Sequence, residues 1–434
     1  MTWSSDSRYL ATSCFLPVCP ATASQVDLWD IAGGKLLRSV DAGLGSTKAL
    51  FGLPGWLATQ SDALTGGARV TLSAIANVQT AQSRELRRLA DVAFDGQSRA
   101  FVAGRFGELF VLDSRTRAMT ERPALGSKPT DRFVALRYAT SSGLLVVIDE
   151  EQGVELLDPK TLARAVDKTV SLSNLTGFGV SPNSEHLAIA KFRGGIAIYS
   201  TRDLRLERSL RAAIQPAAVT TVDWVDDQHL VSSDGSAAIH WDIATGKSLP
   251  LGRAASTPRC QVALSAQPVS KLFAMVDAEC QLSIRSAATG SASFQARLPQ
   301  SEPKSRVAFK STLVMSPRGD TVATINDDCA LLVSDANSGR PLYTTTFGKG
   351  RLCGAHFDFS PDGKLLALAD GAIHLLRMAD GREATLHVAE QAQRREAFVV
   401  SNGELAGDGR IAHCFPERPA LVKQDLLAAF ADGR

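Results

Sequence analysis

The 434-residue sequence contains no apolar stretch that approaches the roughly 18 residues of a membrane-spanning helix. Its first residues, MTWSSDSRYLATSCFLPVCP, lack a charged region followed by an apolar block, so we expect no cleaved secretory signal. Charge of one sign is not concentrated either: the formal net charge is +2, and the densest basic clusters are Arg84–Arg88 and the pair Arg394 and Arg395. Binding to nucleic acid needs basic residues concentrated on one face, so we expect no nucleic-acid partner, and the lack of a long apolar run predicts no membrane partner. The sequence alone leaves open a patch formed by basic residues that are dispersed along the chain.

Cysteine is scarce and scattered, with seven residues in the chain. Only Cys14 and Cys19 lie close together, and no second Cys or His pair follows at metal-ligand spacing. We therefore expect buried thiols, no bound metal, and a reducing compartment, which indicates a cytoplasmic protein.

The motifs of common enzymes are missing. There is no G-x-S-x-G, no phosphate-binding G-x-x-x-x-G-K-[ST], no H-E-x-x-H and no EF-hand loop. The acidic segment 326–328 (NDD) falls where a hairpin turn is expected, and Cys280, Cys329, His240 and His374 fall in predicted strands. We predict that the chain is not an enzyme: no catalytic residue, no metal ligand and no cofactor.

The sequence does contain a repeat, in which a short turn segment precedes an apolar run. The spacing between copies is about 40 to 50 residues, the period of a four-stranded propeller blade. Clear copies start at Ser4, Ser181, Ser316 and Ser360, and weaker ones near Leu53, Asp95, Thr140, Asp226, Ala266 and Ser401.

Each repeat has the same internal pattern. In the copy from Phe357, a short strand leads to a turn in which Pro361 presets φ and Gly363 accepts a positive φ. The apolar run LLALA, the segment AIHLLRM and the segment REATLHVA follow as further strands, separated by turn residues. Four short strands per repeat predict an all-β blade.

The third strand of several repeats ends in an apolar residue followed by Asp. Trp29-Asp30 and Trp241-Asp242 are complete Trp-Asp pairs, and Leu112-Asp113 and Leu157-Asp158 are degenerate versions. We expect the aromatic ring to pack between neighbouring blades, and the carboxylate to accept hydrogen bonds within the following turn.

These features together resemble the WD40 repeat family: SPDGKLLALA, a third strand ending in Trp-Asp, and a following TGK turn. The resemblance covers about residues 1–400. Most copies lack the Gly-His of the family, which leaves its Asp–His–Ser/Thr–Trp hydrogen-bond network open. The end of the chain, FVVSNGELAGDGRIAHC followed by PALVKQDLLAAF, is similar to WD40 segments of bacterial proteins that also carry a caspase-like peptidase.

The expected fold is an all-β, WD40-like β-propeller of eight or nine four-stranded blades over residues 1–400. Since the first turn begins at residue 4, either 397–400 (AFVV) returns to complete the first blade, or the chain forms two incomplete rings of a longer protein. The tail 401–434 is expected to carry an amphipathic helix at about 420–431, which packs on the propeller or serves as a partner-binding or linker helix.

A propeller without catalytic motifs predicts a scaffold that presents a rigid rim of turns to protein partners. Candidate contact residues on these turns are Trp56, Arg105, Phe106 and Arg193. We expect no small-molecule cofactor.

The alternative is a propeller enzyme, a hydrolase or lyase, with a polar site on the central channel. The innermost strands are mostly apolar, and their most notable polar residues are Arg137, Asp223, His356 and Asp358. Fold alone does not decide between the two functions.

Overall fold

A computed structural model describes most of the chain. The described residues are 1–13, 25–41, 46–62, 68–75, 80–86, 89–104, 108–116, 118–122, 134–149, 153–171, 175–191, 195–211, 221–234, 237–251, 260, 262–267, 269–298, 312–325, 330–346, 356–369, 373–391, 394–401 and 404–407. The predicted helix at 420–431 lies outside these residues, as do segment 326–328 and Cys329.

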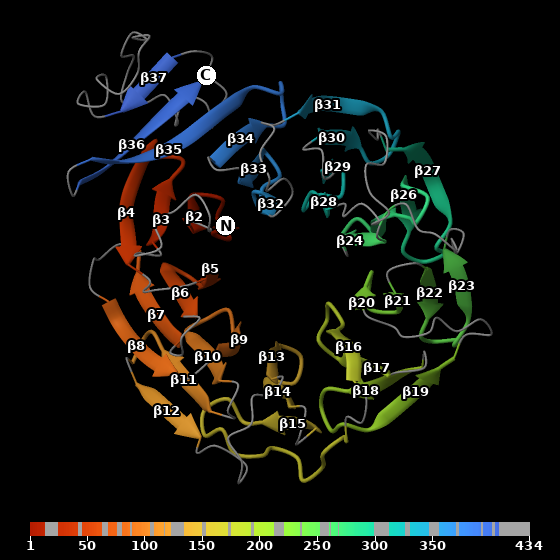
Figure 1. Ribbon diagram of the computed structural model, residues 1–434. Coiled ribbons are helices and arrows are strands. Elements are labelled where there is room, and N and C mark those ends of the chain that lie inside the picture. The colour runs from red at the N-terminus through yellow and green to blue at the C-terminus, as the bar shows by residue number, and fades with distance from the viewer. Residues whose placement is uncertain are drawn as a thin grey trace.

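Nine antiparallel sheets, called blades 1 to 9 in chain order, stand around a common axis (Figure 1). Blade 1 contains β1 (Thr2–Trp3), β2 (Tyr9–Ser13), β3 (Gln25–Asp30) and β4 (Lys35–Asp41). Blade 2 contains β5 (Ser46–Leu53), β6 (Trp56–Asp62), β7 (Ala68–Ala74) and β8 (Thr80–Leu86). Blade 3 contains β9 (Leu89–Phe94), β10 (Arg99–Gly104), β11 (Leu109–Asp113) and β12 (Met119–Arg122). Blade 4 contains three described strands, β13 (Val134–Ala139), β14 (Leu144–Asp149) and β15 (Gly153–Leu157). Blade 5 contains β16 (Leu175–Val180), β17 (His186–Lys191), β18 (Ile196–Ser200) and β19 (Leu206–Leu210). Blade 6 contains β20 (Thr221–Trp224), β21 (His229–Ser233), β22 (Ala238–Asp242) and β23 (Ser248–Leu251).

Blades 7 to 9 complete the ring. Blade 7 contains β24 (Ala263–Gln267), β25 (Leu272–Val276), β26 (Gln281–Ser286) and β27 (Ala292–Arg297). Blade 8 contains β28 (Thr312–Met315), β29 (Thr321–Ile325), β30 (Ala330–Asp335) and β31 (Pro341–Thr346). Blade 9 contains β32 (His356–Phe359), β33 (Leu365–Ala369), β34 (Ile373–Arg377), β35 (Glu383–Gln391), β36 (Arg394–Ser401) and β37 (Glu404–Gly407). The described residues form strands and turns without a helix, so the predicted all-β propeller is confirmed, with nine blades.

The repeated turn segment is held by its own serine. In blade 9 the Ser360 hydroxyl donates to Asp362 at 2.7 Å and accepts the backbone N–H of Leu365 at 3.0 Å. Gly363 adopts the positive φ of 71° that the turn requires. Ser4, Ser181 and Ser316 accept the corresponding backbone N–H in their own blades. The sequence pattern therefore encodes one locally closed turn, used again from blade to blade.

The Asp at the end of the third strand fixes the next turn, as predicted. Asp242 accepts the backbone N–H groups of Ala244 at 2.8 Å and Thr245 at 3.0 Å. Asp335, which the Trp-Asp pattern missed because Ser334 stands before it, accepts the N–H of Ser338 at 2.7 Å. Where the third strand ends in Asp, the carboxylate accepts N–H groups of the next turn while the preceding side chain varies.

Apolar side chains fill the seams between blades. Because both faces of each sheet are covered, the second and third strands read as continuous apolar runs rather than alternating ones. Among the described residues nine buried clusters occur, and each joins two neighbouring blades. One pair from each, in ring order, is Leu28–Leu57, Leu72–Leu112, Phe101–Leu145, Ile148–Tyr199, Ile198–Trp241, Val231–Phe273, Leu282–Leu313, Ile325–Phe357 and Trp29–Leu375.

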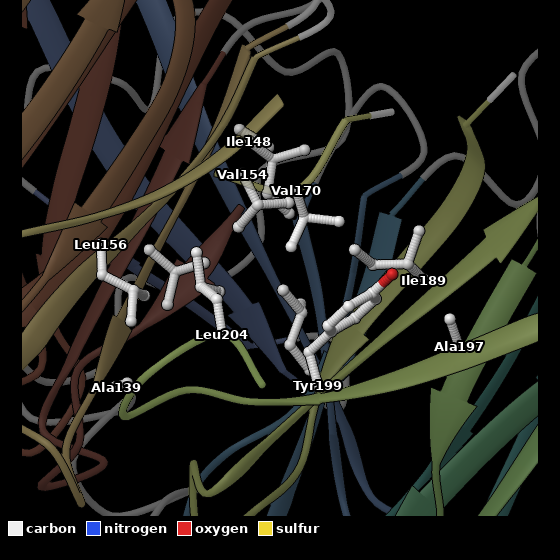
Figure 2. Packing of buried hydrophobic residues seen from close by; sticks show 12 residues of the cluster. Ala139, Ile148, Val154, Leu156, Val170, Ile189, Ala197, Tyr199 and Leu204 are labelled. Carbon is white, nitrogen blue, oxygen red and sulfur yellow. The ribbon is translucent and has the colours of Figure 1, made fainter. Parts of the chain in front are cut away.

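Figure 2 shows the seam between blades 4 and 5, where Ile148, Val154 and Leu156 of blade 4 face Tyr199 and Leu204 of blade 5. In the seam between blades 5 and 6, fully buried Trp241 donates its indole N–H to Ser232 at 2.9 Å. The indole of Trp29 packs in its seam without a hydrogen-bond partner among the described residues. The predicted wedging of both tryptophans is confirmed.

The ring closes between blade 9 and blade 1. Trp3, Leu10 and Trp29 of blade 1 share a buried cluster with Leu365 and Leu375 of blade 9.

Each of these two blades has its own innermost strand, so two expectations are wrong. Segment 397–400 does not complete the first blade, because β36 pairs with β35 and β37 at the outer edge of blade 9. The chain forms one ring rather than two incomplete ones. The ninth sheet also continues to Gly407, past the domain boundary predicted at residue 400.

Candidate functional site

The innermost strands of the nine blades, β1, β5, β9, β13, β16, β20, β24, β28 and β32, surround the central channel (Figure 1). Arg137 of β13 is half-exposed there and links three of these strands. Its guanidinium forms an ion pair with Asp91 of β9 at 2.9 Å and stacks over the ring of Phe178 of β16 at 5.2 Å. Asp91 also accepts the backbone N–H of Leu136 at 3.0 Å. These contacts tie Arg137 to the wall of the channel.

Two channel carboxylates are perturbed by their surroundings. Asp223 of β20 and Asp358 of β32 are exposed to the channel, yet the protein around them withdraws them from bulk water and raises the pKa of each carboxyl above its ordinary value. They stand on blades 6 and 9, with blades 7 and 8 between them. His356 begins β32, and its side chain is outside the described part. The candidate channel residues are therefore spread around the ring.

The two histidines predicted in strands do lie there. His240 of β22 is buried; burial lowers its pKa, and its Nε2 lies 2.6 Å from the carbonyl oxygen of Ala287 in blade 7. His374 of β34 contacts Glu383 at 2.7 Å. In the described part of the chain, no three His, Cys, Asp or Glu side chains are grouped so as to hold a metal ion. The same residues include no helix long and apolar enough to cross a membrane.

At one rim, the turns between first and second strands contact their neighbours, and we call this ring of turns the turn collar. Ser141 donates to the Ser184 carbonyl across blades 4 and 5 at 2.8 Å. The Asn183 N–H donates to Asp227 across blades 5 and 6 at 2.8 Å. The turns of blades 9 and 1 meet through the Asp362 N–H and the Ser7 hydroxyl, at 2.9 Å. These bonds join the collar turns of blades 4, 5 and 6, and those of blades 9 and 1.

The predicted contact residues have different outcomes. Trp56 follows the turn of blade 2 at the collar, where it is half-buried and packs against the cluster between blades 2 and 3. Arg105, Phe106 and Arg193 lie outside the described residues. The role of all four in binding stays a prediction.

The expectation of free buried thiols is wrong for two cysteines. Cys260 and Cys280 form a disulfide with a Cα–Cα distance of 5.2 Å. Cys280 lies in the turn between β25 and β26, not in a strand, and has a positive φ of 64°. Its carbonyl oxygen accepts the N–H of Leu298, so this turn anchors chain segments on both sides of blade 7. Spacing alone could not reveal this pair, because the two cysteines are 20 residues apart in the sequence.

Comparison with known proteins adds only distant likenesses. No protein-family model matches the sequence. No curated protein matches it either. Among known structures, the chain is similar to BamB from Moraxella catarrhalis, with 14% identity, a TM-score of 0.48, and coverage of 77% of this chain and 94% of that one. It is also similar to the computationally designed Ika8 protein, with 16% identity, a TM-score of 0.49, and coverage of 85% and 96%. At these values the likenesses assign neither a family nor a function.

Proposed function

We propose that this protein is a non-catalytic interaction scaffold of WD40-like type, which presents a rigid propeller rim to protein partners. The observation that carries the proposal is the turn collar. In blades 1, 3, 5, 6, 8 and 9 a side chain of the turn accepts a backbone N–H group of the same turn. Hydrogen bonds such as the one between Ser7 and Asp362 connect some of the neighbouring turns. A surface already fixed in one conformation loses little entropy when a partner binds. Proteins are thus the partners that we propose, with no nucleic acid, membrane or small-molecule cofactor.

The distribution of charge in the channel supports the same proposal. Arg137 is held by Asp91, and Asp223 and Asp358 stand on blades 6 and 9. Acid–base catalysis needs groups that converge on one reacting atom. The innermost strands place these groups apart.

Capture of cross-linked partners from the native host, with the full chain as bait, tests the proposal. A scaffold should yield at least one stoichiometric protein partner, whose cross-links map to the rim. Loss of these cross-links when the collar residue Asn183 is changed to Arg, with the fold retained, would locate the contact. Recovery of no stoichiometric partner would refute the proposal.

A propeller enzyme remains the second candidate, because raised carboxyl pKa values are typical of functional sites. Asp223 and Asp358 are the residues that this alternative requires. Screening a small-molecule library with the wild type and with Asp223→Asn and Asp358→Asn decides between the candidates. Turnover that either variant abolishes would favour the enzyme.

The cytoplasmic location expected from the cysteine content stays a prediction. The Cys260–Cys280 disulfide supports an oxidising compartment instead, because cytosolic thiol systems keep most such bonds reduced. Cell fractionation with thiol trapping at lysis distinguishes the two locations. Reduced cysteines in the cytosolic fraction would support the cytoplasm, and an oxidised Cys260–Cys280 pair outside the cytosol would support the oxidising compartment.

A further inference from the structure

Histidine side chains lie at both seams of blade 6. His186, the first residue of β17 in blade 5, stacks on Trp224 of blade 6 with 6.0 Å between the ring centroids. On the other side, His240 of blade 6 contacts the carbonyl oxygen of Ala287 in blade 7. The sequence has no histidine before residue 186, so the strands of blades 1 to 4 contain none. Of the four histidines whose side chains the structure describes, three lie beside these two seams.

At the seam between blades 6 and 7, three rings lie stacked, and we call them the histidine stack. The ring centroids of His229 and His240 are 5.3 Å apart, with 18° between the ring planes. The ring of Phe273 in β25 follows at 6.1 Å from that of His240, with 8° between the planes. His229 is half-buried, whereas His240 is 4% exposed and Phe273 is fully buried. The imidazole of His240 therefore contacts two other rings and has almost no contact with water.

The hydrogen bond across this seam fixes the tautomer of His240. Nε2 of His240 lies 2.6 Å from the carbonyl oxygen of Ala287. A carbonyl oxygen only accepts hydrogen bonds, so Nε2 must carry the proton of the neutral ring. A second proton would bind Nδ1 and place a full positive charge on this buried side chain. The closed seam therefore favours the neutral form of His240.

Blade 6 places two carboxylates and one further imidazole near His240. Asp226 lies 2.9 Å from Nδ1 of His229, and Asp242 is the partner of His229 in the β21–β22 ladder. Burial opposes a charged His240, and so does the charge of His229, whereas both carboxylates favour it. Burial is the largest of these effects, so the pKa of His240 lies below its ordinary value.

Blade 7 faces His240 with backbone groups, an apolar ring and cations. The turn at 287–290 reaches the imidazole, since a Cβ added at Gly290 would lie 3.1 Å from Cγ of His240. The buried guanidinium of Arg285 donates to the carbonyl oxygen of Gly290 at 2.8 Å. Lys271, whose carbonyl oxygen accepts the N–H of Ala287, is a second cation and is exposed. The carboxylates that stabilise a charged His240 therefore come from blade 6.

We propose that the seam between blades 6 and 7 is a pH-sensitive joint, which is closed while the histidine stack is neutral and loosens when acid charges it. A protonated His229 keeps its contact with Asp226, but its charge then faces the ring of His240. His240 gains a second proton only where water can solvate the charge, which requires the ring to leave the seam. This device is independent of the scaffold function proposed above.

The direction of the pH effect follows from proton binding. With the seam open, His240 has the ordinary histidine pKa of about 6.5, and with the seam closed its pKa is lower. The closed seam therefore keeps its full stability above about pH 6.5 and loses it as the pH falls, because the open form binds more protons. Each unit of difference between the two pKa values allows at most about a tenfold change in the opening equilibrium.

Hydrogen exchange of the full chain tests the proposal, followed by mass spectrometry at about pH 8 and about pH 5, the range in which histidine titrates. After correction for the intrinsic exchange rate, protection of the turn at 287–290 should fall severalfold to about tenfold more than that of β10 in blade 3, which contains no histidine. In the variant His240→Gln this excess loss should disappear, because the amide can donate to Ala287 but cannot take up a proton. His186→Gln is the matched control, since His186 begins β17 as His229 begins β21, and the excess loss should remain.

Equal loss of protection in the two segments of the wild type would overturn the proposal. An excess loss that persists in His240→Gln, or one that His186→Gln abolishes, would overturn it as well. If His240→Gln does not fold, His229→Gln takes its place: removal of the adjacent charge should reduce the excess loss at least about twofold, and an unchanged excess would refute the device.

Discussion

The packing between blades 9 and 1 should contribute as much to the free energy of unfolding as the packing between other neighbouring blades. The variant Leu375→Ala tests this. Leu375 of β34 is fully buried in the cluster that contains Trp29 and Leu365. The substitution removes three carbons, worth about 0.8 kcal/mol each in transfer free energy, or roughly 2.4 kcal/mol. The cavity that remains adds to this loss, so we expect about 3 kcal/mol of destabilisation, inside the range of about 2 to 5 kcal/mol for such changes.

The matched control is Leu187→Ala, which removes an equally buried leucine from the seam between blades 4 and 5. Urea unfolding followed by tryptophan fluorescence should give similar losses for the two variants. If blade 9 did not pack on blade 1, Leu375 would face water, and its replacement would cost less than about 0.5 kcal/mol. A small loss for Leu375→Ala beside a full loss for Leu187→Ala would refute the closed ring.

Three further outcomes follow from other contacts. Trp241→Phe should cost about 1 kcal/mol more than Trp29→Phe in urea unfolding, because the Trp241 indole donates a buried hydrogen bond and the Trp29 indole has no such partner among the described residues; equal costs would contradict this. Removing the Cys260–Cys280 disulfide by double serine substitution should lower stability by about 3 kcal/mol, as expected for a loop of this length, and an unchanged urea midpoint would exclude the bond. Asp223→Asn should raise stability at neutral pH, because the surrounding protein partly desolvates this carboxyl, raises its folded-state pKa and thus opposes the charged form. That gain should disappear as the pH falls below the ordinary carboxyl pKa, and a pH-independent effect would contradict the assignment.

The features that the sequence predicted well depend on neighbouring residues. The serine turn at Ser360 and the Asp cap at Asp242 are closed by groups within five positions, so their patterns are visible along the chain. Strand order follows from the same turns, since each short turn forces the next strand to pair antiparallel with the last. Strand burial follows from runs such as LLALA, which are apolar on both faces.

The features that could not be predicted from the sequence depend on residues that are far apart in the chain. Whether the ring closes is decided by contacts such as Asp362 with Ser7, 355 positions away. The tenth turn signal, at Ser401, belongs to the β36–β37 hairpin, and only the sheet pairing shows that it starts no further blade.

The closed nine-blade ring is most directly tested by a cysteine cross-link across its last seam. In the variant Ser7→Cys/Asp362→Cys, the two new thiols should form a disulfide under mild oxidation, detected by mass spectrometry of linked peptides. The pair Asn183→Cys/Asp227→Cys, which spans blades 5 and 6, is the positive control. We predict comparable cross-linking of both pairs; a linked control beside an unlinked Ser7→Cys/Asp362→Cys variant would contradict ring closure.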